Sequence, residues 1–177
     1  MTENYNNTCF KKIEEAEVYD VAIRSPLEFA KTLSKRFNNE IFLKREDLQP
    51  VFSFKLRGAY NKIAKLKKSK KIKKLITASA GNHAQGVALA AKKLEIKACI
   101  VMPKSTPGIK IEAVKSLKAE VILYGDSYDD AYDYALKKAK SKKLEFVHPY
   151  DDLDVIAGQG TIGVEIINQI QSKPDYI

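Results

Sequence analysis

From residue 75 onward, short apolar runs alternate with longer segments of helical pattern. The apolar runs occupy residues 75–79, 97–102, 120–124 and 146–148. Between them lie stretches of ten or more residues with apolar side chains at helical spacing. Strands that alternate with such helices form βαβ units, which require a parallel sheet and right-handed crossovers. The sequence therefore predicts an α/β fold with open parallel sheets flanked by helices.

Two of the later helices carry signals at their ends. Thr106 followed by Pro107 predicts an N-cap and a proline at the first helical position. A last helix is predicted over residues 161–170. The Gly-Gln-Gly-Thr segment at 158–161 opens it, either as a tight turn or as a loop that cradles phosphate.

The first half of the chain is less regular. A helix is predicted over residues 10–18, an extended piece and a helix over 27–37, and a strand over 41–44. After a polar break, Ser53 is predicted as the N-cap of a helix, which puts Lys55 in the first turn. One helical stripe follows, made of Leu56, Ala59, Tyr60, Ile63 and Leu66.

Lys55 breaks a local rule, because the first turn of a helix is electrically positive and disfavours an ammonium group. Its neighbours Phe54 and Leu56 are apolar, and Arg57 follows two residues later. Desolvation and nearby positive charge both lower the pKa of a lysine. A lysine that is partly neutral near pH 7 is a nucleophile able to form a Schiff base. The alternative is a surface lysine that merely begins a helix.

A second candidate segment lies where a predicted strand ends and a helix begins. It consists of Ser79, Ala80, Gly81, Asn82 and His83. Ligands of open parallel sheets bind at this carboxyl edge, and free N–H groups at a helix start hold anions such as carboxylates. The alternative for Asn82 is an ordinary N-cap.

The histidines and cysteines give weaker signals. His83 is either a base or a metal ligand, although no carboxylate or cysteine stands at ligand spacing from it. His148 is predicted to be structural. Cys9 and Cys99 are not at ligand spacing either, which favours a reduced, cytoplasmic protein. No apolar run approaches the roughly 20 residues that span a bilayer.

The formal net charge is +9 over 177 residues, and eight lysines lie between residues 62 and 74. Such a run can bind nucleic acid through phosphates. This run contains no arginine and no interleaved aromatic residues, so a solvated helix end is favoured over a nucleic-acid site.

Four motifs together resemble the threonine dehydratase (threonine ammonia-lyase) family of fold-type II pyridoxal-phosphate enzymes. Their order and spacing match the family from about residue 13 to the end. The motifs are Lys44-Arg45-Glu46-Asp47, Ser53-Phe54-Lys55-Leu56-Arg57-Gly58-Ala59, Ser79-Ala80-Gly81-Asn82-His83-Ala84-Gln85-Gly86 and Ala157-Gly158-Gln159-Gly160-Thr161.

The resemblance implies pyridoxal 5'-phosphate as cofactor and a role for each matching residue. Lys55 matches the Schiff-base lysine, Phe54 the aromatic beside the cofactor ring, and Asn82 the partner of the ring hydroxyl. Residues 79–83 match the loop that receives the substrate carboxylate. The implied reaction is β-elimination of L-threonine to 2-oxobutanoate and ammonia, with Lys55 as the base; serine is a possible second substrate.

The resemblance also implies how the chain is organised. Residues 1–73 would form the first part of a large domain, 74–149 a small βαβ domain, and 150–177 the return to the large domain. Residues 175–177 resemble the start of another strand, so we expect an N-terminal fragment without the family's Gly-rich phosphate loop. Such a fragment would be poorly active alone, and the full-length form is expected to be a homo-oligomer with no nucleic-acid or membrane partner.

Three other interpretations stay open from the sequence. One is a serine racemase-like relative, although that family usually reads Ser-Gly-Asn-His-Gly where this chain has Ala80 and Ala84. Another is a non-catalytic α/β module that serves in binding or assembly. The last is a basic nucleic-acid binder that uses residues 62–74. Covalent trapping of the cofactor on Lys55 would distinguish a pyridoxal-phosphate enzyme from a non-catalytic module and from a nucleic-acid binder.

Overall fold

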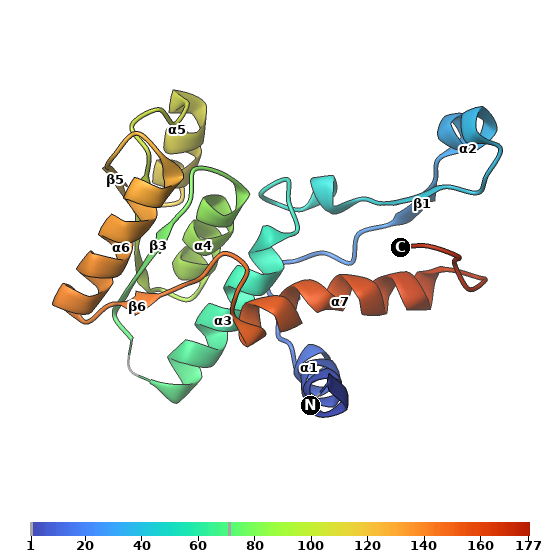
Figure 1. Cartoon of the computed structure of the whole chain (residues 1–177), viewed down its shortest axis with the longest axis horizontal. Helices are drawn as coiled ribbons and strands as arrows, with labels where there is room; N and C mark the ends of the chain where they lie inside the picture. The colour runs from blue at the N-terminus through green and yellow to red at the C-terminus, as the bar shows by residue number, and fades with distance from the viewer. Residues whose placement is uncertain (1, 71) are drawn as a thin grey trace.

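The computed structural model describes residues 2–70 and 72–177, with side chains from residue 7 onward. Its main sheet is four-stranded and fully parallel, has the strand order β5-β4-β3-β6, and lies at one end of the molecule, on the left of Figure 1. The strands are β3 (Lys74–Ala78), β4 (Lys97–Met102), β5 (Glu120–Leu123) and β6 (Glu145–Phe146). The predicted α/β fold with a parallel sheet is therefore confirmed.

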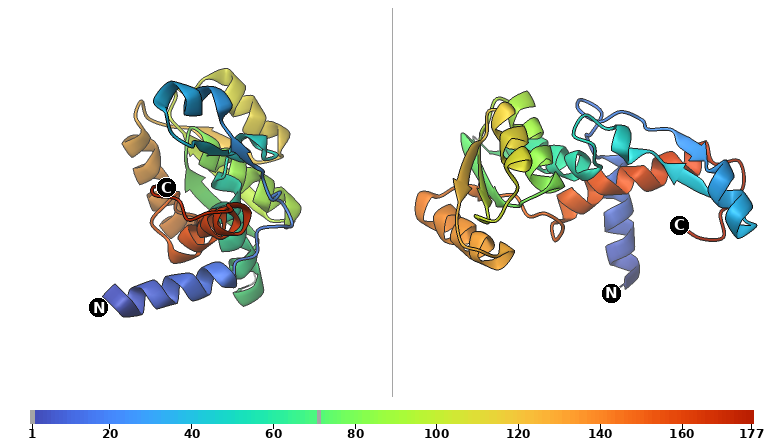
Figure 2. Two further views of the ribbon diagram at one scale, coloured as in Figure 1. Left: turned by 90° about the vertical axis from the view of Figure 1, so that its right-hand side faces the viewer. Right: turned by 90° about the horizontal axis from the view of Figure 1, so that it is seen from above.

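Helices cover both faces of this sheet (Figure 2). On one face, Leu75 and Ile100 belong to a core built with α3 (Lys55–Ser69), α4 (Asn82–Lys93) and α5 (Gly108–Ser116). On the other face, Ile76 and Val101 pack with α6 (Tyr128–Lys142). Neighbouring residues of one strand thus enter different cores, as the period-two geometry of a strand requires.

The remaining elements extend away from the sheet (Figures 1 and 2). Helix α7 (Leu153–Gln169) packs against α3 and against α1 (Thr2–Glu14). An antiparallel pair, β1 (Leu27–Phe29) and β2 (Phe42–Lys44), encloses α2 (Lys31–Phe37) and leads into the short 3₁₀ helix η1 (Glu46–Leu48). No helix among the residues described is long and apolar enough to cross a membrane.

Several predicted boundaries are wrong, most clearly in α7. This helix begins at Leu153, because the Asp152 side chain caps it by accepting from the backbone N–H groups of Asp154 and Val155. The segment 158–161 therefore lies inside the helix and is neither a turn nor a phosphate loop. Similarly, α1 begins at Thr2 rather than near residue 10.

Two further predictions fail at element ends. Helix α5 begins at Gly108 with Pro107 as its N-cap, and the buried Thr106 hydroxyl has no partner within the described part of the chain. Residues 171–177 form no strand, since a strand needs a neighbour to satisfy its backbone groups and none pairs with them among the described elements.

Gly158 in α7 allows close packing against α3. A Cβ at Gly158 would lie 2.6 Å from the Arg57 carbonyl oxygen and 2.8 Å from the Gly58 Cα. Contacts that short force the two backbones apart. The conspicuous Gly-Gln-Gly sequence is therefore explained by helix–helix contact.

We expect Gly158→Ala to lower the free energy of unfolding by about 1–3 kcal/mol because the added methyl group overpacks the α3–α7 contact. Gly163→Ala is the matched control in the same helix, since a Cβ there meets nothing within 4 Å. The control should raise stability by roughly 0.5–1 kcal/mol through helix propensity. Urea unfolding of both variants measures the effects. Equal stability of the two variants would contradict the packing explanation.

Candidate cofactor and substrate site

Three segments meet at the carboxyl edge of the sheet. Strands β3 and β6 are paired, and the Thr77 hydroxyl near the end of β3 donates to the Val147 carbonyl oxygen just after β6 at 2.7 Å, so the loops that follow the two strands start side by side. The third segment is the start of α3, from which the Lys55 Nζ donates to the Pro149 carbonyl oxygen at 3.0 Å. The lysine amine therefore reaches the edge where parallel sheets bind ligands.

The start of α3 is built slightly differently from the prediction. Phe54, rather than Ser53, occupies the N-cap position and makes no side-chain cap. The Ser53 hydroxyl still accepts from the Lys55 backbone N–H at 3.3 Å. Lys55 is thus the first residue of the helix, as the predicted first-turn position requires.

The Lys55 side chain is half-buried, and burial lowers the pKa of its amine below the ordinary value. The Nζ lies 5.3 Å from the centroid of the Phe54 ring. The predicted contribution of Arg57 to this lowered pKa is wrong, because the Arg57 guanidinium is paired with the carboxylates of Glu46 and Glu165. Desolvation alone accounts for the shift.

The loop after β3 is held by its first residue. The Ser79 hydroxyl, which is buried, accepts from the backbone N–H groups of Gly81 and Ala84, each at 3.2 Å. Gly81 is the N-cap of α4, so the alternative of Asn82 as an N-cap is wrong. The exposed Asn82 amide makes no hydrogen bond to the described residues, and an added Cβ at Gly81 would meet only open space.

Gly86 brings the two helix starts together. A Cβ on this residue would lie 3.0 Å from the Leu56 backbone and from the Lys55 carbonyl carbon. The absence of a side chain therefore lets the second turn of α4 contact the first turn of α3. This contact places Lys55 close to the start of α4 at Asn82. Sequence reasoning assigned Gly86 no role, although a glycine within an alanine-rich helical pattern is a signal for close approach.

His83 is a buried neutral imidazole. Its Nε2 lies 3.2 Å from the Val147 carbonyl oxygen, and because a carbonyl only accepts, Nε2 carries the proton. Its Nδ1 has no partner within the described structure. Burial is the main cause that lowers its pKa to about 4, which argues against the predicted role as a base near neutral pH.

His148 has the structural role predicted for it. Its Nδ1 accepts from the backbone N–H groups of Tyr150 and Asp151, the latter at 2.7 Å. These bonds shape the loop that presents the Pro149 carbonyl to Lys55. No group of three or more His, Cys, Asp or Glu side chains among the residues described could hold a metal ion.

The donor set at this edge fits pyridoxal phosphate. Lys55 offers an amine whose lowered pKa favours reaction with an aldehyde. The Phe54 ring, 37% exposed, offers a face for an aromatic ring, and Asn82 offers a free amide. The unpartnered Nδ1 of the buried His83 is a further polar atom nearby.

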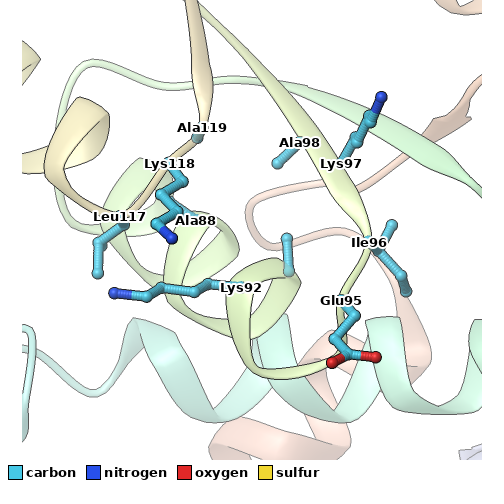
Figure 3. A pocket seen from close by; sticks show the side chains of 10 residues that line it. Ala88, Lys92, Glu95, Ile96, Lys97, Ala98, Leu117, Lys118 and Ala119 are labelled. Atoms are coloured by element: carbon cyan, nitrogen blue, oxygen red, sulfur yellow. The ribbon is translucent and has the colours of Figure 1, made fainter.

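One hollow among the described residues lies away from this edge. A groove of about 400 Å³ runs between the end of α4 and the starts of β4 and β5, at the amino edge of the sheet (Figure 3). Alanine side chains and the stems of Lys92, Lys97 and Lys118 line much of it, as Figure 3 shows. It is far along the sheet from the carboxyl edge and takes no part in the candidate site.

Most lysines of the basic run have acidic partners. Lys62 pairs with Asp152 at 2.7 Å, Lys70 with Glu145 at 2.9 Å, and Lys74 with Glu120 at 2.5 Å. Lys65 and Lys68 also contact carboxylates. These pairs leave fewer free charges for phosphates than the run of lysines suggests.

Known proteins resemble this chain over most of its length. Residues 18–177 match the family model described as pyridoxal-phosphate dependent enzyme. The biosynthetic, chloroplastic threonine dehydratase of Arabidopsis thaliana is 58% identical over 89% of this chain and 26% of the relative. The L-threonine dehydratase of Burkholderia multivorans is 56% identical over 91% of this chain and 32% of the relative. The chain thus spans about a quarter to a third of these relatives.

A solved structure gives the same relationship in three dimensions. Threonine deaminase isoform 2 from Solanum lycopersicum superposes with a TM-score of 0.88 and 51% identity. The match covers 93% of this chain and 46% of that one. The predicted resemblance and the fold-type II architecture are confirmed, and the chain belongs to the family of pyridoxal-phosphate dependent enzymes.

Proposed function

We propose that this chain carries the Schiff-base lysine of an enzyme that eliminates the β-hydroxyl of L-threonine to give 2-oxobutanoate and ammonia. The observation that carries the proposal is the half-buried Lys55 amine, which reaches the carboxyl edge of the sheet and has a lowered pKa. The relatives at 56–58% identity are named threonine dehydratases, which supports the same reaction.

Each residue of the site has a proposed task, and Lys55 and Asn82 each have two. Lys55 would hold the cofactor through its aldehyde, and its amine, once free, would accept the substrate Cα proton at Nζ. The Phe54 ring packs beside the cofactor, and the Asn82 amide orients the ring by a hydrogen bond. The substrate carboxylate binds at the start of α4, among Ser79, Ala80, Gly81, Asn82 and His83.

The order of these tasks follows from the chemistry of the groups. The bound cofactor acts as an electron sink that acidifies the Cα–H bond. Lys55 can take that proton only when its amine is neutral, which its burial favours. The Cα proton and the β-hydroxyl together leave as water, and hydrolysis of the enamine that remains gives 2-oxobutanoate and ammonia.

The experiment that tests this function is covalent capture. The purified chain is incubated with pyridoxal phosphate, reduced with borohydride and digested, and the modified peptide is identified by mass spectrometry. We expect the label on the peptide that contains Lys55. A label spread over the exposed lysines, with none at Lys55, would refute the proposal and leave a non-catalytic α/β module.

Asn82→Ala should weaken capture without harming the fold. The Asn82 side chain is exposed and has no hydrogen bond to the described residues, so its loss costs little stability. Loss of one hydrogen bond to the cofactor should raise the pyridoxal phosphate concentration for half-maximal capture by roughly threefold to tenfold, equivalent to about 0.5–1.5 kcal/mol. Titration of the aldehyde absorbance measures it. An unchanged midpoint would exclude Asn82 from the cofactor site.

Threonine is the proposed substrate, and serine the proposed alternative. A serine racemase from maize matches with a TM-score of 0.85 but only 31% identity, over 90% of this chain and 49% of that one. The greater identity to proteins named threonine dehydratase or deaminase favours elimination. Comparing oxo-acid release with racemisation distinguishes the two reactions.

The proposed organisation keeps residues 1–73, 74–149 and 150–177 as separate parts. The parallel sheet lies wholly within 74–149, which supports a small βαβ domain. Helices α3 and α7, from the outer parts, pack together. We further propose a homo-oligomer, and a reducing compartment for the free Cys9 and Cys99. A cytoplasmic location is one such compartment, although the Arabidopsis relative is named chloroplastic.

A further inference from the structure

A fully buried arginine lies two residues after the proposed Schiff-base lysine. Arg57 has 0% exposure and all five of its N–H donors have acceptors. Nε and Nη2 bind the two oxygens of Glu46, each at 2.8 Å, and Nη1 binds Glu165 at 2.7 Å. The remaining donors reach the Thr161 hydroxyl at 3.1 Å and the Ile23 carbonyl oxygen at 3.0 Å.

A second cation completes the cluster. Lys44 donates to Glu165 at 2.6 Å, to the Ser25 carbonyl oxygen at 2.6 Å and to the Gln169 side chain at 2.8 Å. Burial would raise the pKa of Glu165, but its hydrogen bonds from Arg57, Lys44 and Tyr19 outweigh burial and hold the pKa below the ordinary value. We call Arg57, Lys44, Glu46 and Glu165 the charge quartet. It contains two cations and two anions and has no net charge.

The quartet joins segments that are distant in sequence. Lys44 and Glu46 come from β2 and η1, Arg57 from the first turn of α3, and Glu165 from α7. Since Arg57 is bound on both sides by bidentate carboxylates, the first turn of α3 can neither rotate nor shift without breaking charged hydrogen bonds. Lys55 belongs to that same turn.

Stability alone does not account for this arrangement. Apolar residues of similar volume are often as stabilising as a buried ion pair, because removing charges from water is costly. The planar guanidinium of Arg57 fixes the geometry of its hydrogen bonds, which an apolar side chain cannot do. The cluster is also neutral, so it orients the lysine without adding a positive field that would act on the amine.

We propose that Arg57 is a positioning residue, which through the charge quartet aims the Lys55 amine at the cofactor aldehyde. The inference rests on the proposed function, since it assumes that Lys55 is the residue that bonds to pyridoxal phosphate. It predicts that capture depends on the geometry of the quartet in addition to the amount of folded protein.

The test measures capture rate against pyridoxal phosphate concentration, with borohydride trapping and peptide mapping at Lys55. The concentration dependence separates non-covalent affinity from the limiting rate of bond formation. Arg57→Lys keeps the charge but loses the planar fork. We expect its limiting rate to fall by at least about tenfold, because small misplacements of a reacting group are costly.

A matched control separates an effect on the orientation of the Lys55 amine from an effect on the stability of the fold. Ile63→Val alters a fully buried residue of the same helix and leaves the quartet untouched. It should lower the melting temperature while keeping the limiting rate of the folded fraction within about twofold, since Ile→Val removes one buried methyl group and leaves the rest of the core in place. Equal loss of rate in Ile63→Val and Arg57→Lys would overturn the inference, as would a normal rate in Arg57→Lys.

A second pair of variants tests the charge balance. Glu165→Gln leaves the quartet with one uncompensated cation, whereas the double change Lys44→Met with Glu165→Gln restores neutrality. We expect the double variant to recover part of the limiting rate lost in Glu165→Gln, which is the coupling that interacting residues show. Simple additivity would count against the quartet as a unit. If wild-type protein captures no cofactor at Lys55, the proposed function itself fails, which is a separate outcome.

Discussion

Lys55→Ala is expected to abolish covalent capture of pyridoxal phosphate at the carboxyl edge of the sheet. Among the described residues of α3, only Lys55 has an amine that donates to the Pro149 carbonyl oxygen. Burial lowers the pKa of this amine. A neutral amine is the form that attacks an aldehyde. After borohydride reduction, the peptide spanning residue 55 should carry no label, and the aldehyde-dependent absorbance change should disappear.

Lys67→Ala is the matched control for this experiment. Lys67 lies on the same helix, is exposed and donates to the Leu94 carbonyl oxygen at 2.9 Å. Its loss should leave capture at Lys55 unchanged. Capture that persists in Lys55→Ala at the wild-type level, or that fails equally in Lys67→Ala, would show that labelling reflects general lysine reactivity and would remove the chemical basis of the proposed function.

The second large effect is a loss of stability in acid that depends on His83. Its pKa is lowered from 6.5 to about 4 in the folded chain. Above about pH 6.5 the imidazole is neutral in both states and contributes no pH dependence. Between pH 6.5 and 4 the unfolded chain binds a proton that the folded chain does not, so the free energy of unfolding falls as the pH falls.

The fall of the His83 pKa from 6.5 to about 4 corresponds to about 3 kcal/mol in the free energy of unfolding. This contribution is lost between pH 6.5 and pH 4, and His83 causes no further change below pH 4. His83→Gln keeps a donor for the Val147 carbonyl but cannot titrate. Urea unfolding at a series of pH values should therefore show a shallower acid slope in the variant. Parallel curves for the two proteins would mean that His83 titrates normally in the folded chain.

Periodicity was sufficient to predict the sheet and the helices around it. The apolar runs at 75–79 and 97–102 became β3 and β4 within a residue or two. The stripe that contains Leu56 and Ile63 is buried as predicted. Such patterns are local, because each residue's face is set by its own position in a strand or helix.

Element ends were predicted less well, since they depend on competing caps. The glycines at 158 and 160 suggested the start of a helix, but Asp152 caps α7 several residues earlier. Gly158 is explained by its contact with the α3 backbone at Arg57 and Gly58, and Gly160 by its contact with the Ile13 side chain of α1, both of which are distant in sequence. Composition alone cannot distinguish a glycine needed for a turn from one needed for close packing.

The sequence by itself determined the βαβ order, the first-turn position of Lys55 and the position of residues 79–83 between a strand and a helix. These features are encoded in spacing along the chain. Only the tertiary structure decided that the Pro149 carbonyl receives the Lys55 amine, that Gly86 brings α4 against α3, and that Glu46 and Glu165 neutralise Arg57. Charge and burial act through space, so a residue's electrostatic effect is set by neighbours that the linear order does not reveal.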